Sequence, residues 1–188
     1  MNQDIGRAIV FSMPVVSAAV SLILISLDTT RSSNTVDRKI HYNMIAVYCL
    51  MILFWSGLVM HSIARDTFIA YLPVFFSSFA FIPVFLYRIT HIITDTGERK
   101  LFPACHFILP ACLTLIICAI ALAVPLRQRW AAIYDNEVNL TSAIIDITFI
   151  VCILLCILYS WLSLLRIKSY KRKIIDYSAD IYRMSLDW

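Results

Sequence analysis

The chain has few of the residues that keep a soluble domain in water. Only 15% of its 188 residues are charged, and it has three glycines and six prolines, whereas a soluble domain carries about 25% charged residues. Hydrophobic residues make up 61% of the chain, more than a soluble sphere of this size can hide. The composition excludes an ordinary soluble domain, a disordered or fibrous chain and a nucleic-acid binder with a basic surface. It predicts an integral membrane protein of the all-α class.

The cysteines do not form a disulfide framework. Five of the six lie inside apolar runs, and the sixth, Cys105, lies at the edge of one. A thiol in such a place behaves as a small hydrophobe. We interpret them in this way, and the redox compartment is not readable from them.

Five stretches are long enough to cross a bilayer, which takes about 20 mostly apolar residues. They contain no Asp, Glu, Lys or Arg, and they cover residues 8–27, 44–64, 68–87, 107–126 and 147–165. The first run is longer than the apolar core of a signal peptide and has no small-residue cleavage site, so we expect it to be retained. The sequence therefore predicts a transmembrane helical bundle over residues 1–165 and a basic juxtamembrane tail over residues 166–188.

The distribution of positive charge predicts the orientation. Five spans place the termini on opposite sides, and twelve of the sixteen Lys and Arg residues fall on the side of the C-terminus. Cytoplasmic loops hold the excess of these residues. We expect the N-terminus outside and the C-terminus in the cytoplasm.

Polar candidates for a site are few. Asp146, enclosed by Ile145 and Ile147 at the start of the fifth span, could bind a ligand or a proton, or could simply favour the positive N-terminal end of a helix. His106 follows Cys105, but one adjacent pair without a spaced partner does not make a metal site. We expect no metal.

Prolines and small residues mark the apolar runs. Prolines kink helices and could form hinges or cavities, although proline is also generally more frequent in membrane helices. Five of them lie within the spans: Pro14, Pro73, Pro83, Pro110 and Pro125. Small residues at 17–21 and 119–123 permit close helix packing, either within the chain or in a homodimer.

No catalytic signature is present. The sequence has no glycine-rich phosphate loop, no His-Glu-x-x-His and no Cys-x-x-Cys, so we expect neither an enzyme nor a cofactor. Asn139-Leu140-Thr141 matches a glycosylation acceptor, but we discount it because it lies almost against the membrane.

A basic cluster directly follows the fifth span. Such a cluster can attract anionic lipid at about 1 kcal/mol per basic residue, and it can also anchor the topology; both interpretations hold together. Its members are Arg166, Lys168, Lys171, Arg172 and Lys173.

Two stretches resemble a known family. One contains Tyr87-Arg88, Thr94-Asp95-Thr96-Gly97 and His106-Phe107-Ile108-Leu109-Pro110; the other contains residues 170–173, then Tyr177-Ser178 and Leu186-Asp187-Trp188. They resemble the membrane-embedded sensor region of bacterial transmembrane regulators with an AraC-type helix-turn-helix domain, and of related sensor histidine kinases. The resemblance covers the chain from about Phe85 onward.

The resemblance implies a sensory and signal-transducing module of a bacterial inner membrane, linked to transcription regulation. In the family about two more spans and a cytoplasmic output domain follow, so we interpret this chain as an input half that stops before that domain and makes no nucleic-acid contacts itself. It would be either a truncated gene product or a natural sensor-only fragment. Its partners would be the lipid bilayer and an unknown small-molecule or membrane signal. The candidate signalling residues are Arg88, His106, Pro110 and Asp146. The alternative is a small membrane transport or assembly protein.

Overall fold

The computed structural model describes residues 2–31, 35–94, 102–135 and 139–186. In these ranges the chain forms helices and no strands. The elements are α1 (Asn2–Arg31), α2 (Thr35–Ile63), α3 (Arg65–Ile93), the 3₁₀ helix η1 (Ala104–Phe107), α4 (Ile108–Ala123), α5 (Leu126–Tyr134) and α6 (Leu140–Leu186). The expected all-α class is confirmed.

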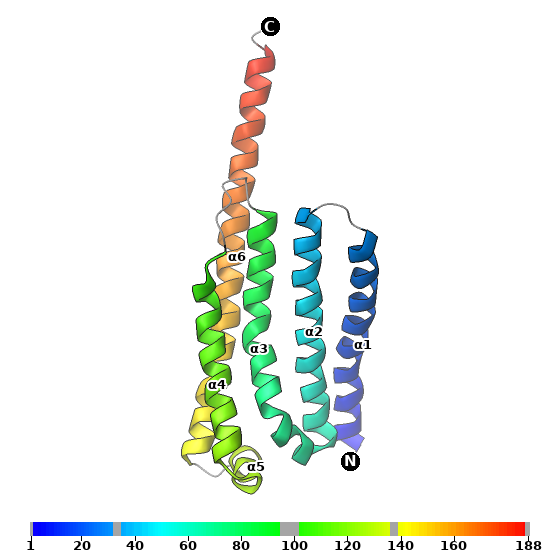
Figure 1. Cartoon of the computed structure of the whole chain (residues 1–188), viewed down its shortest axis with the longest axis vertical. Helices are drawn as coiled ribbons and strands as arrows, with labels where there is room; N and C mark the ends of the chain where they lie inside the picture. The colour runs from blue at the N-terminus through cyan, green and yellow to red at the C-terminus, as the bar shows by residue number, and fades with distance from the viewer. Residues whose placement is uncertain (1, 32–34, 95–101, 136–138, 187–188) are drawn as a thin grey trace.

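Five segments are long and apolar enough to cross a membrane, as the sequence predicts. They are Asp4–Thr30, Val36–Ile63, Arg65–Ile93, Ala104–Ala123 and Leu140–Ile174. The chain is therefore a multi-pass membrane protein with a helical bundle. Its first and last helices begin at the same end of the bundle and run in the same direction, so the two termini lie at opposite ends (Figure 1).

The helices form an open arrangement around α3. Helices α1, α2 and α3 stand in a row, and α4 and α6 pack on the far side of α3 from α2 (Figure 1). In the most hydrophobic 18-residue segment of each helix, the buried share of the segment is 44% in α3, 11% in α1 and α2, and 22% in α4 and α6. Helix α3 is thus the centre of the bundle, and most of the surface of the other helices faces outward.

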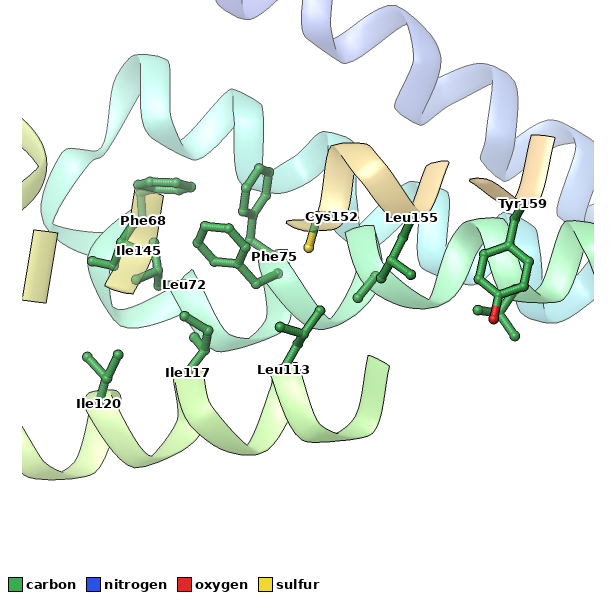
Figure 2. Close-up of a cluster of buried hydrophobic side chains, with 13 residues drawn as sticks. Phe68, Leu72, Phe75, Leu113, Ile117, Ile120, Ile145, Cys152, Leu155 and Tyr159 are labelled. Atoms are coloured by element: carbon green, nitrogen blue, oxygen red, sulfur yellow. The ribbon is translucent and has the colours of Figure 1, made fainter. Parts of the chain in front are cut away.

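The core lies where α3, α4 and α6 meet (Figure 2). Helix α3 contributes Phe68, Leu72 and Phe75, and α4 contributes Leu113, Ile117 and Ile120. Both sets follow the i, i+4, i+7 spacing that places side chains on one helical face. Helix α6 adds Ile145, Cys152, Leu155 and Tyr159. Cys152 is fully buried in this cluster, where its thiol packs as a hydrophobic group.

Helices α2 and α3 approach each other closely at a glycine. A Cβ atom added to Gly57 would lie 2.6 Å from Cδ2 of Phe75 and 3.3 Å from Cε1 of Tyr71. On α1, the predicted small-residue patch places Ala18 in contact with the bundle, with 4% of its surface exposed. On α4, Ala119 and Ala123 are exposed, so these two residues do not pack within the chain.

The fourth hydrophobic stretch ends differently from the expectation. Helix α4 stops at Ala123, and Val124 is extended with φ −102° and ψ 126°. The residue before a proline is driven out of the helical region by the proline ring, which here belongs to Pro125. The chain then turns into α5, a nine-residue helix at the end of the bundle that also holds the N-terminus (Figure 1).

Candidate functional site

An aromatic cluster joins three helices near the end of the bundle from which α6 projects. We call it the junction cluster, and it comprises Tyr87, Arg88 and His91 of α3, Phe102, His106 and Phe107 around η1, and Tyr159 of α6. The His106 ring lies 5.0 Å from Phe102, 5.4 Å from Tyr87 and 5.7 Å from Tyr159 between centroids. These distances are typical of favourable aromatic pairs. The cluster therefore fixes η1 and the start of α4 between α3 and α6.

His106 and Tyr159 form the polar centre of the junction cluster. The Tyr159 hydroxyl donates a hydrogen bond to the His106 carbonyl at 3.3 Å. The same hydroxyl lies 3.1 Å from Nδ1 of the His106 ring. Pro110, fully buried four residues later, has no N–H with which to serve this carbonyl. The Tyr159 hydroxyl thus supplies a donor from another helix.

Arg88 holds the segment before α4 against α3. Its guanidinium lies 6.0 Å from the ring centroid of Phe102 and 5.8 Å from that of Phe107. Such cation–π contacts are worth about 0.5–1 kcal/mol at exposed sites and more where water is excluded. Of the four candidate signalling residues, Arg88, His106 and Pro110 are therefore brought together.

A second contact ties α6 to α3. Nε of Arg166 donates a hydrogen bond to Oγ1 of Thr94 at 2.7 Å, and that hydroxyl donates to the Thr90 carbonyl at 2.7 Å. Arg166 thus differs from the other four residues of the basic cluster. Lys168, Lys171, Arg172 and Lys173 are exposed on α6, where they form a basic surface.

Asp146 lies apart from the junction cluster. Its side chain is exposed on α6, near the other end of the bundle. The helix begins at Leu140, capped by Asn139, whose Oδ1 accepts the Ser142 N–H at 2.9 Å. Asp146 is therefore in the second turn, whereas the effect of the helix end falls off within the first turn.

A buried arginine that sequence reasoning did not single out ties α5 to α3. Arg129 is 7% exposed, and its Nη1 donates to the Ile69 carbonyl at 3.1 Å. In a regular helix this carbonyl would accept from the residue four positions later, but that residue is Pro73. Nε of Arg129 also donates to the Val124 carbonyl at 3.1 Å. From the sequence, Pro73 indicates that the Ile69 carbonyl lacks its usual helical donor. No feature of the sequence indicates that Arg129 replaces that donor.

The described residues contain no group of three or more His, Cys, Asp or Glu side chains that could hold a metal ion. What the arrangement can do is mechanical: aromatic contacts and two polar contacts connect α6 to α3 and to the start of α4. A displacement of any one of these helices must therefore be shared by the others or break the contacts.

The fold and the site define the class: an all-α, multi-pass membrane protein whose central helix is held by Arg129 near its start and by the junction cluster and Arg166 near its end. Comparisons with protein-family models, curated proteins and solved structures find no match.

Proposed function

We propose that the chain is a membrane sensory and signal-transducing module in which α6 carries a change in bundle packing out of the membrane. One observation carries this proposal. Helix α6 is a single helix of 47 residues, about 70 Å long at about 1.5 Å per residue, whereas the bilayer core is about 30 Å thick. It packs in the bundle core and then projects beyond the other helices (Figure 1).

The contacts of α6 lie where a transmitting helix would need them. Tyr159 and Arg166 attach it to the start of α4 and to the end of α3, and the exposed basic surface follows directly. A ligand can bias such a system only through its different affinity for two packing states. A shift of α3 or α4 would then rotate or translate the whole of α6.

The sequence motifs support the same proposal. Tyr87-Arg88 and His106-Phe107 belong to the stretch that resembles the sensor region of AraC-type transmembrane regulators, and these residues meet in the junction cluster. Asp95, Thr96, Gly97, Asp187 and Trp188 of the same resemblance lie outside the described residues. In this proposal the module lies in a bacterial inner membrane with its basic end in the cytoplasm, and its output is transcriptional.

Insertions into α6 test the proposal directly. One to four alanines are inserted after Lys173 in the full chain, with an oligomerisation-sensitive reporter fused to the C-terminus. Each added residue rotates the helix by about 100°, so reporter output should oscillate with insertion length, and three or four residues should largely restore it. An output that is flat or falls steadily with length would show a passive tether and contradict the proposal.

A pair of point variants separates the junction from the helix itself. Tyr159→Phe removes the hydroxyl that contacts His106 and should shift reporter output. Tyr170→Phe, on the same helix, is the control, because no hydrogen bond of the Tyr170 hydroxyl is formed with any described residue. Equal output from the wild type and both variants at equal membrane levels would remove the junction cluster from the pathway.

A further inference from the structure

A cavity lies at the end of the bundle opposite the junction cluster. The N-terminal part of α1, the turn between α2 and α3, and α5 all lie at that end (Figure 1). The cavity has a volume of about 530 Å³, within the range of about 300–1,000 Å³ that is usual for small-molecule sites. Its lining residues are Asp4, Ser62, Ile63, Ala64, Arg65, Asp66, Thr67 and Trp130.

The lining places both signs of charge around one space. Arg65 and Asp66 are neighbours in the chain, yet neither side chain forms an ion pair or a hydrogen bond with another described residue. The Arg65 guanidinium lies instead 5.1 Å from the ring centroid of Tyr134, a contact that leaves its N–H groups able to bind an anion. Asp4 adds a second carboxylate to the lining.

The neutral groups of the lining fit a ligand with an ammonium and an apolar part. The Ser62 hydroxyl donates its hydrogen to the Leu58 carbonyl at 3.1 Å, so its oxygen can only accept from a ligand. Trp130 presents an indole, the aromatic side chain that attracts cations best. Ala64 precedes α3 and provides no side-chain cap, so the first N–H groups of that helix can add to the binding of a carboxylate.

We propose that this cavity binds a small zwitterion that carries an ammonium and a carboxylate, such as a neutral α-amino acid. Arg65 receives the carboxylate, and Asp66 and Trp130 surround the ammonium. A simple anion would face the Asp66 carboxylate, and a simple cation would face the Arg65 guanidinium. This inference rests on the proposed function, because it names the class of signal that the module receives.

Binding to the full-length protein in lipid nanodiscs tests the proposal by calorimetry. A panel of neutral L-amino acids that includes leucine is compared with 4-methylpentanoate and 3-methylbutylamine, which are leucine without its ammonium and without its carboxylate. We expect at least one amino acid to bind. The two compounds that lack only its ammonium or only its carboxylate, chosen as for leucine, should each bind at least about tenfold more weakly. Absence of binding by the whole panel at 10 mM (about −2.7 kcal/mol), or equal binding by an analogue, overturns the proposal.

Charge-neutralising variants locate the site. Arg65→Gln and Asp66→Asn should each weaken binding at least about tenfold. The matched controls Arg127→Gln and Asp135→Asn change exposed residues at the same end of the bundle that do not line the cavity, and should leave the affinity within about twofold. Equal losses in variants and controls would place the ligand elsewhere and overturn the assignment, and the wild-type analogue series decides the matter if a variant fails to fold.

The outcomes separate this inference from the proposed function. Calorimetry needs no output domain, and the insertion series in α6 needs no ligand. Failure of the amino acids with an oscillating insertion series would reject the zwitterion alone. Binding of an amino acid with a flat insertion series would keep the cavity and reject transmission through α6.

Discussion

Replacing Arg129 tests whether a side chain takes over the backbone bond that Pro73 removes. Arg129→Met keeps much of the apolar stem but removes the donors to the Ile69 and Val124 carbonyls, both at 3.1 Å. A buried acceptor left without a partner costs about 1–3 kcal/mol. Arg129 is buried, with 7% of its surface exposed, so the change also removes the cost of desolvating its charge, which opposes that loss. Because these two effects oppose each other, the unfolding free energy of Arg129→Met alone is less informative than the coupling free energy between positions 129 and 73.

A double-mutant cycle isolates the bond to Ile69. In Pro73→Ala the new backbone N–H can serve the Ile69 carbonyl, so Arg129→Met should cost less in that background. Hydrogen bonds between membrane helices average about 0.6 kcal/mol, with a maximum of about 1.7, and a charged donor is at the strong end of the range. We expect a coupling free energy of about 1–2 kcal/mol, measured as the free energy of reversible unfolding in mixed micelles.

The control for the cycle is Arg127→Met in the same two backgrounds. Arg127 is exposed on α5, so its coupling to position 73 should lie within about 0.3 kcal/mol of zero, the usual error of additivity. If Arg129 and Pro73 also couple by no more than this amount, the Ile69 carbonyl does not depend on the guanidinium, and the reasoning is wrong.

Three further predictions concern stability in the same unfolding assay. Gly57→Ala should destabilise the protein by about 1–3 kcal/mol, because the new Cβ would lie 2.6 Å from a ring atom of Phe75. The control Gly6→Ala should be neutral or stabilising, because no atom outside the neighbouring helix backbone lies within 4 Å of a Cβ at that position. Equal effects of the two variants would contradict the close α2–α3 contact at Gly57. Tyr134→Phe should be neutral or stabilising, since the buried hydroxyl has no hydrogen-bond partner among the described residues and an unpaired polar group costs free energy. Burial raises the pKa of Tyr134 above 10, so the folded state resists ionisation of the phenol and the protein should lose stability as the pH rises above about 10. Tyr134→Phe should reduce this loss, and an unchanged alkaline profile would refute the assignment. Asn139→Ala should cost about 1 kcal/mol through loss of the α6 cap, and an unchanged unfolding free energy would show that the cap adds nothing.

The membrane-crossing segments could be predicted because hydropathy reports them directly. The first, third and fifth expected spans lie on single helices that are longer than the spans: α1 extends from Asn2 to Arg31 and α6 from Leu140 to Leu186. The second and fourth expected spans continue past Ile63 and Ala123, where α2 and α4 end. Helical hydrogen bonds continue into polar surroundings, while the hydrophobic signal stops where the bilayer stops. Hydropathy therefore indicates where the membrane is and says little about where a helix ends.

The contacts between distant parts of the chain could not be predicted. Arg88, His106 and Pro110 were chosen from motifs, and the structure brings them together, but Tyr159 is 53 residues from His106 in the chain. The hydrophobic pattern along one helix shows which face of that helix is buried, but it does not show which residues of another helix that face contacts. Helix α5 was not predicted because nine residues are too short to produce a strong hydrophobic period.

The two ends of α3 explain why α6 is the element most suited to transmit a change. Arg129 fixes the first turns of α3 to α5, and Arg88 with the junction cluster fixes its last turns to η1. Helix α1 packs on α2 and α2 packs on α3, and His61 at the end of α2 also contacts Tyr134 of α5. A ligand held by Arg65 and Trp130 would therefore act on α3 and α5 together, and both of these helices contact α6. Among the described helices α6 alone continues beyond the bundle (Figure 1), so in the proposed function it would deliver any repacking that reaches it to the exposed basic surface on that helix.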